Sequence, residues 1–401
     1  MANILIPDYA GQQVIAGIKS LSLHGDTCDL AWDIKKTDYL FKSKYIQELY
    51  SIPPASEDSD DYAQGLVELL KTHPYDMIIP FGNDANHAVN RAQDELRKYT
   101  RLLTPSRRSH EIAYDKQATA QHCREVGIDA PATFFDYAES DLPAIANHLR
   151  YPVVIKARSG SGVKSGLRYA TNQDELLIKF NELNDLIRAN DHAEYANPII
   201  QEFIPGYVHD ACLLLENGKT LATLTQIRHL MYPITGGVGA INYTTHNAEL
   251  GAIAIQLMES LDWNGPAQVE FKYDERDKKY KLIEINPKLW GTLDLSIQSG
   301  VSFPVLIRDL LMGEKVTQPA YDAGNVYYFL YPQTSLARLQ SFMTFGKDNP
   351  PVSIQITRKF RDVDWGDFKP LFGRFLKTAA IALTGNIANE TYNLPKELIN
   401  R

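Results

Sequence analysis

Two carboxylates and an amide lie on neighbouring segments of the chain that both have the pattern of β-strands. The segment AQVEFKY carries Glu270, and KYKLIEIN carries Glu284 and Asn286 on one face with isoleucines on the other. If Tyr273 pairs with Lys281 in a hairpin, Glu270 lies opposite Glu284, although a one-residue slip would remove that pairing. Opposed like charges destabilise a sheet unless a cation lies between them. Oxygen ligands without a nearby His or Cys suit Mg²⁺, and the alternative is a solvated carboxylate at the sheet edge.

A loop rich in glycine and serine lies between two apparent strands in VVIKARSGSGVKSGLRYA. Backbone N–H groups of such a loop can hold phosphates. A Walker A motif would require glycines in place of Arg158 and Val163, so that motif is excluded. The loop is therefore either a glycine flap over a ligand or an ordinary hairpin loop. Lys156, on the preceding strand, is either a snorkelling lysine or a cation that faces a phosphate.

Composition limits the class of protein. A chain of 401 residues is too long for one typical core and indicates two or three domains. The net charge of -8 argues against a nucleic-acid-binding protein. The three cysteines are isolated, which indicates neither a zinc site nor a disulfide framework. No signal peptide and no apolar run of about 18 residues is present, so we expect a cytoplasmic protein without a transmembrane segment.

The N-terminal half alternates strand and helix patterns, which predicts α/β layering. Residues 1–105 are predicted to form a small parallel-sheet domain, without the GxGxxG of a dinucleotide site. Because ligands of such sheets bind at the carboxyl ends of the strands, Asp8, Tyr9, Asn83 and Asp84 are candidates for the substrate side. A helix is expected from about Asp115 to Gly127.

Three features are predicted in the second half. A hairpin is expected to turn at Asn217-Gly218, and a second glycine loop spans Thr235 to Gly239. Near the C-terminus, apolar residues at helical spacing predict one stripe that docks onto the domain, with dimer contact or membrane-surface association as alternatives. The stripe consists of Phe368, Leu371, Phe372, Phe375, Leu376 and Ala379, with Lys369, Arg374 and Lys377 between them.

The order of these features resembles the ATP-grasp superfamily, whose members include D-alanine–D-alanine ligase, biotin carboxylase and the large subunit of carbamoyl phosphate synthetase. Over roughly residues 105 to 315 that order is Lys116, Lys156 with the Gly/Ser loop, IIQEFIPG, Arg228, GPAQVEF and IEINPKLWG. The resemblance implies a multidomain α/β and α+β fold: a pre-ATP-grasp domain (1–105), an ATP-grasp domain (106–318) and a C-terminal extension (319–401). Within the ATP-grasp domain it implies a glycine-flap lobe at about 130–200 and a metal-binding lobe at about 201–318.

The resemblance also implies residue roles. The expected ATP contacts are Lys116, Lys156, the flap residues Ser159, Gly160, Ser161 and Gly162, the hinge residues Gln201, Glu202, Phe203 and Ile204, and His209 or Asp210 at the ribose. Either Gln201 or Glu202 contacts adenine. Mg²⁺, with Mn²⁺ as the alternative, is expected at Glu270, Glu284 and Asn286. Arg228 and Lys288 are the candidate catalytic cations, and Lys288 replaces a commoner arginine whose planar bidentate grip a lysine does not make.

The implied activity is that of a ligase. ATP would convert a small carboxylate into an acyl phosphate, which an amine, or less readily a thiol, would attack with release of ADP and phosphate. The flap and the second glycine loop would close over this intermediate to exclude water. The alternatives are a phosphotransferase on the same fold and a nucleotide-binding regulatory protein without turnover. The sequence leaves open whether the chain forms a homodimer.

Overall fold

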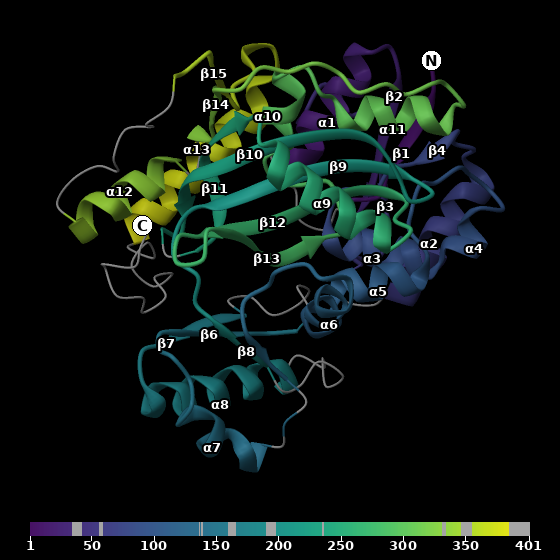
Figure 1. Ribbon diagram of the computed structural model, residues 1–401. Helices are drawn as coiled ribbons and strands as arrows, with labels where there is room; N and C mark the ends of the chain where they lie inside the picture. Colours follow the sequence, from purple (N-terminus) through teal and green to yellow (C-terminus); the bar gives the residue numbers. More distant parts are fainter. Residues whose placement is uncertain are drawn as a thin grey trace.

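Three β-sheets organise the described part of the chain (Figure 1). The computed structural model describes residues 1–33, 42–55, 59–135, 137, 139–158, 166–189, 198–234, 236–330, 334–345 and 355–384. The flap residues Ser159, Gly160, Ser161 and Gly162, and also Thr235, lie outside the described residues.

The first sheet is parallel and has the strand order β3-β2-β1-β4. Its strands are β1 (Asn3–Ile6), β2 (Thr27–Trp32), β3 (Leu49–Ser51) and β4 (Met77–Ile78). They alternate with the helices α1 (Gln12–Leu23), α2 (Ser59–Thr72), α3 (Asn83–Arg91) and α4 (Gln93–Leu96). Ile4, Leu5 and Ile6 of β1 are all fully buried, because a central parallel strand is covered on both faces. The parallel α/β arrangement predicted from the sequence is confirmed.

A small antiparallel sheet follows, in the order β5-β8-β6-β7. It contains β5 (Thr133–Phe134), β6 (Val153–Lys156), β7 (Leu167–Ala170) and β8 (Ile199–Glu202), with α7 (Leu142–Ala146) and α8 (Gln173–Ala189) packed on one face. In Figure 1 this small lobe projects below the main body. Val153 and Ile155 pack against α8, so alternation along β6 directs Val154 and Lys156 to the opposite face.

The large sheet has seven strands in the order β13-β12-β9-β10-β11-β14-β15, antiparallel except for the last pair. The strands are β9 (Val208–Glu216), β10 (Lys219–Tyr232), β11 (Val238–Thr245), β12 (Gly265–Asp274), β13 (Lys279–Asn286), β14 (Asn325–Tyr328) and β15 (Arg358–Arg361). The predicted turn between β9 and β10 is confirmed: Asn217 and Gly218 have φ values of 48° and 74°, as a tight hairpin turn requires.

Helices cover both faces of the large sheet. On one face, α5 (Arg107–Tyr114), α6 (Lys116–Val126) and α9 (Ala248–Ser260) pack over a core that includes Trp263 and Phe271. Helix α6 has the expected limits, with an Asp115 cap and Gly127 at φ 71°.

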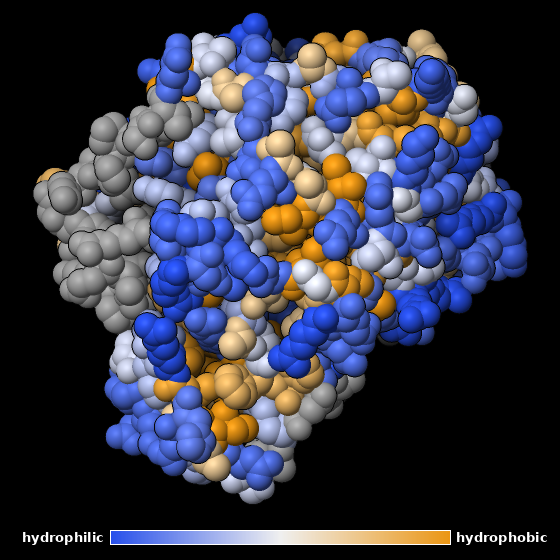
Figure 2. All heavy atoms as spheres, in the orientation of Figure 1, coloured by the Kyte–Doolittle hydropathy of each residue, from blue (hydrophilic) through white to orange (hydrophobic). Residues whose placement is uncertain are grey.

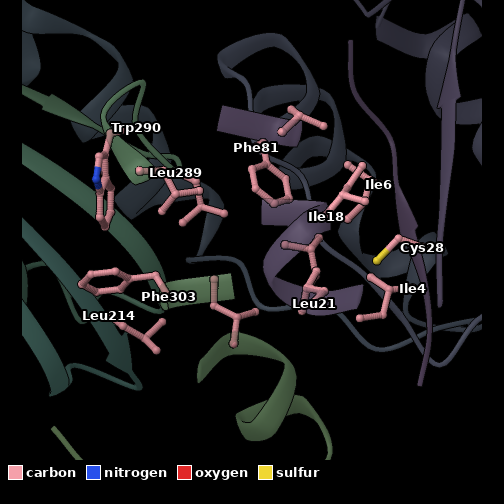
Figure 3. Close-up of a cluster of buried hydrophobic side chains, with 14 of the residues drawn as sticks. Ile4, Ile6, Ile18, Leu21, Cys28, Phe81, Leu214, Leu289, Trp290 and Phe303 are labelled. Carbon is pink, nitrogen blue, oxygen red and sulfur yellow. The ribbon is translucent and has the colours of Figure 1, made fainter. Parts of the chain in front are cut away.

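On the other face, one hydrophobic core joins the first sheet to the large sheet. Ile4, Ile18 and Phe81 from the N-terminal region meet Leu214 of β9 and Phe303 of α11 (Phe303–Leu311) within that core. Figure 3 shows these side chains facing one another. Helix α10 (Leu293–Gln298) also lies at this junction, so the two sheets are held together by shared apolar contacts.

The C-terminal stripe differs from its prediction. Helices α12 (Ser335–Phe345) and α13 (Phe368–Thr384) are present, but Phe368, Phe372, Phe375 and Leu376 each remain more than 40% exposed. The residues of α13 that are buried are Pro370 and Thr378, so the apolar stripe is only partly covered. No helix among the described residues is long and apolar enough to span a membrane.

Candidate functional site

A pocket of about 580 Å³ lies between the small lobe and the large sheet. In Figure 2 the small lobe is set off from the body, with hydrophobic residues visible at their junction. The pocket brings together most of the residues selected from the sequence: Lys116, Lys156, Gln201, Glu202, Phe203, Ile204, Arg228, Glu270, Glu284, Asn286 and Lys288. Gly236 to Gly239, from the second glycine loop, also line it.

The two carboxylates of the candidate metal site are paired as predicted. Glu270 lies opposite Glu284, and the Asn286 amide nitrogen donates to Glu270 Oε1 at 2.8 Å. The expected pairing of Tyr273 with Lys281 is wrong, because a β-bulge after Glu270 shifts the register by one and pairs Tyr273 with Tyr280. The bulge keeps both carboxylates on the pocket face while the distal half of the hairpin follows a different register.

The electrostatics of this pair are asymmetric. Burial raises the pKa of Glu270 to about 7; Arg228 opposes that shift and the charge of Glu284 adds to it. Burial acts the same way on Glu284, but Lys116, Lys156 and Arg228 outweigh it and hold the pKa of Glu284 below its usual value. Two carboxylates and one amide, with no His or Cys among the described lining residues, fit a hard cation such as Mg²⁺.

Arg228 is engaged by protein carboxylates. Its Nε and Nη2 atoms donate to the two oxygens of Asp210 at 3.0 and 2.8 Å, and Nη2 also donates to Glu270. Burial disfavours the charge, but Asp210 and Glu270 more than offset this and raise the pKa of Arg228. From the sequence we expect Arg228 to contact a γ-phosphate or a substrate carboxylate. In the structure, its guanidinium already binds Glu270, a carboxylate of the candidate metal site.

His209 and Asp210 do not line the pocket in the described part of the chain. Adjacent residues of a strand point to opposite faces, and His209 lies against the ring of Tyr280 on the far face of the sheet. Burial lowers the pKa of His209 to about 4 and keeps it neutral. Asp210 is fully buried beneath Arg228 and also accepts from Gln226. Both placements argue against the expected ribose contact.

The two expected nucleotide lysines face the pocket from different elements. Lys116 is the first residue of α6, and its Nζ lies 3.6 Å from Glu284 Oε2. Lys156 ends β6 and donates to Gln201 Oε1 at 2.9 Å. Burial lowers the pKa of Lys156 to about 8, although the charge of Glu284 acts in the opposite direction. Both lysine side chains therefore reach the pocket from regular secondary structure.

The hinge residues Gln201 and Glu202 have different partners. Gln201 points inward, and its amide nitrogen donates to Thr133 Oγ1 at 3.0 Å while its oxygen accepts from Lys156. Glu202 also lines the pocket, but its carboxylate pairs with Arg276 at 2.7 Å. Both alternatives for the adenine contact line the pocket, and Gln201 is the more buried of the two.

The substrate side is only partly as expected. Asn83, at the start of α3, lines the pocket together with Gln12 and Gln13 from the start of α1. Asp8, Tyr9 and Asp84 are not among the lining residues. Asp8 instead accepts from the backbone N–H groups of Phe81 and Gly82, and burial raises its pKa to about 6.

Lys272 was not selected from the sequence, yet it lines the pocket. The signal is present in the sequence, because Lys272 follows Glu270 by two residues and alternation places both on one face. Lys288, which was selected, has no side-chain hydrogen bond or ion pair within the described ranges. Burial lowers its pKa, while Glu284 and Glu270 act against that shift.

A second group of potential metal ligands lies behind the pocket wall. Ligand atoms of His87, His110 and Glu111 lie within 4.8 Å of one another. Burial lowers the pKa of His110 to about 3, and both imidazoles stack against Tyr114. This arrangement is that of an aromatic cluster supporting Tyr114, which itself lines the pocket.

Comparison with known proteins agrees with this geometry. Residues 199–328 match a family model described as "ATP-grasp in the biosynthetic pathway with Ter operon". Biotin carboxylase 1 of Bacillus subtilis (strain 168) is 25% identical over 246 residues, covering 59% of this chain and 54% of that protein. The chain thus spans about half the length of this curated relative.

Solved structures share the fold. A biotin carboxylase from Campylobacter jejuni, crystallised as a β-γ-ATP complex, superposes with a TM-score of 0.67 at 15% identity, covering 81% of this chain and 74% of that one. An L-amino acid ligase from Bacillus licheniformis gives a TM-score of 0.60 at 14% identity, with 80% and 74% covered. The family match, the sequence relative and the fold agree: residues 199–328 are similar to an ATP-grasp family, and the chain shares the fold of solved ATP-grasp structures.

Proposed function

We propose that the protein is an ATP-dependent ligase that activates a small carboxylate as an acyl phosphate for attack by an amine. The observation that carries the proposal is the convergence, in one pocket, of two lysines from different lobes with two opposed carboxylates. The lysines are Lys116 and Lys156, and the carboxylates are Glu270 and Glu284. This combination suits a polyphosphate that is neutralised from one side by ammonium groups and from the other by a metal.

The residues present fit a divalent metal. Glu270, Glu284 and Asn286 would hold Mg²⁺, with Mn²⁺ as the alternative. When bound, the metal supplies charge neutralisation to the phosphates. Arg228 acts on this site as a positioning residue. It donates a hydrogen bond to Glu270, and two hydrogen bonds to Asp210 hold the guanidinium in that orientation.

The proposed reaction has two steps. A carboxylate oxygen attacks the γ-phosphorus of ATP, and the bond to the bridging oxygen breaks so that ADP leaves with the electron pair. The amine nitrogen then attacks the acyl carbon, the bond between carbon and the phosphate oxygen breaks, and the amine proton is lost. The products are an amide, ADP and phosphate.

The protein's part is positioning and charge neutralisation rather than nucleophilic attack by a side chain. Lys116 and Lys156 bind the phosphates and hold them against the metal carboxylates. Lys288 lines the pocket two residues beyond Asn286, where the charges of Glu284 and Glu270 act on it, and it would bind the incoming carboxylate. Gly236 to Gly239 line the same pocket and would exclude water from the acyl phosphate.

The proposal is tested by isotope transfer. The protein is incubated with ATP, Mg²⁺, pooled amino acids or peptides and carboxylates labelled with ¹⁸O, and the released ADP and phosphate are measured. A ligase of this type leaves one labelled oxygen in the phosphate, because the carboxylate oxygen that attacks the phosphorus departs with it.

A phosphorylated product without free phosphate would identify a phosphotransferase instead. Binding of ATP without product for any pool would identify a regulatory nucleotide-binding protein. Glu284→Gln should lower ADP release by about a hundredfold. Glu216→Gln, which changes an exposed strand residue of the same sheet, should leave it unchanged.

A further inference from the structure

Lys272 reaches the hinge between the two lobes from the large sheet. Its Nζ donates to the backbone oxygen of Ile204 at 2.9 Å and lies 5.1 Å from the centre of the Phe203 ring. Both hinge residues line the pocket, as does Lys272 itself. The lysine therefore crosses from β12 to the end of the pocket formed by the hinge, away from the carboxylate pair.

The charge of Lys272 is poorly compensated. Its side chain is partly buried, and the like charge of Lys156 is nearby. No ion pair of Lys272 exists within the described ranges, whereas Lys116 pairs with Glu284. A buried ammonium without a carboxylate is costly unless other acceptors surround it.

Two acceptor atoms at the hinge end of the pocket are already used by lysines. Gln201 Oε1 already accepts from Lys156, and the oxygen of Ile204 already accepts from Lys272. An ammonium group has three donors, so each lysine keeps donors that the protein does not use in these contacts. A ligand that brings acceptor atoms to this end satisfies them, and one that brings only donors does not.

We propose that Lys272 is a specificity-determining residue that donates a hydrogen bond to an acceptor atom on the base of the bound nucleotide. The inference rests on the proposed function, since it assumes that this pocket takes a nucleotide. Purine rings carry acceptors at nitrogens 1, 3 and 7. The lysine thus selects among nucleotides by the acceptors of the base, in addition to tethering the hinge.

The test is the affinity for ADP, measured by calorimetry without turnover on the full chain. Wild type and Lys272→Met are each titrated with ADP and with its 1-deaza, 3-deaza and 7-deaza analogues, in which one ring nitrogen is replaced by CH. We expect Lys272→Met to weaken ADP binding about tenfold or more. For one analogue, the affinity of the wild type should be as low as the affinity of the variant for ADP. The variant should bind that analogue about as weakly as it binds ADP, because the two changes remove the same hydrogen bond.

The matched control is Lys281→Met. Lys281 is paired with Lys272 in the ladder of β12 and β13, but its Nζ bonds Asp277 at 2.5 Å and it does not line the pocket within the described ranges. This variant should bind ADP and all three analogues as the wild type does.

Several results would overturn the inference. One is an affinity of Lys272→Met for ADP that lies within twofold of the wild-type value. Another is an equal loss of affinity for every analogue in both proteins, which is the result expected if Lys272 only tethers the hinge. If Lys272→Met does not fold, the wild type alone decides, because an analogue series without any loss removes the proposed hydrogen bond. Failure of wild type to bind ADP at all would instead overturn the proposed function.

Discussion

Glu270 and Glu284 face each other across β12 and β13 because a β-bulge begins directly after Glu270. Without the bulge, the register of the distal hairpin, which pairs Tyr273 with Tyr280, would continue to the metal site and displace the carboxylates by one position. The register break therefore lies at the point where two like charges must meet.

Glu284→Gln should lose activity by on the order of a hundredfold, because it removes a metal ligand and the partner of Lys116. The measurement is ADP release under saturating ATP and Mg²⁺. Glu216→Gln serves as the control for an ordinary loss of one carboxylate from the sheet. Wild-type rates in Glu284→Gln would show that the metal site lies elsewhere.

Arg228→Met should destabilise the protein by about 3–5 kcal/mol, because Asp210 and Glu270 would be left as buried carboxylates without their shared cation. Chemical denaturation measures the change, and the exposed Arg358→Met provides the comparison. A variant that keeps its stability and loses only activity would favour the sequence-based expectation that Arg228 contacts substrate.

Nucleotide affinity should fall as pH rises through about 8. The pKa of Lys156 is lowered to about 8 by burial, so its ammonium is mostly charged at pH 7 and mostly neutral at pH 9, and phosphates bind the charged form. The dissociation constant for ADP should rise about tenfold over this range. In Lys156→Arg the charge persists, so a smaller rise is expected; an identical rise would assign the titration to another group.

Metal affinity should rise with pH between 6 and 8. Glu270 has a pKa raised to about 7 by burial, so a proton competes with the metal below that pH and not above it. Glu284, with a pKa below its usual value, stays charged throughout this range. Titration with Mn²⁺ followed by electron paramagnetic resonance measures the change. Glu270→Gln should bind more weakly and without this pH dependence, and a pH-independent wild type would contradict the assignment.

The sequence predicted those parts of the site that depend on local periodicity. Alternation along a strand placed Glu284 and Asn286 together. Lys116 was selected through the resemblance in motif order, and it lines the pocket at the start of α6. The partner of Arg228 was not predictable in this way. That contact depends on the strand order, in which β9 lies between β10 and β12. Long-range packing sets this order, and it brings Asp210 of β9 and Glu270 of β12 within reach of the Arg228 guanidinium.

The expected ribose contact was not supported for a similar reason. His209 and Asp210 are adjacent in the sequence, and a strand sends their side chains to opposite faces. The position of β9 in the sheet determines what each face contacts. His209 faces the helix-covered core, and Asp210 faces Arg228. A resemblance in the order of motifs does not carry this information.

The hydrophobic core shared by the first sheet and the large sheet limits how the N-terminal region can diversify. Leu214, Leu289 and Phe303 of the larger body are buried by Ile18 and Phe81 of the smaller one. A recombination event that exchanged residues 1–105 for a foreign segment would expose that surface unless both sides changed together. Under the proposed function, substrate range should therefore evolve by point substitution around the pocket residues Gln12, Gln13 and Asn83, rather than by exchange of a whole domain.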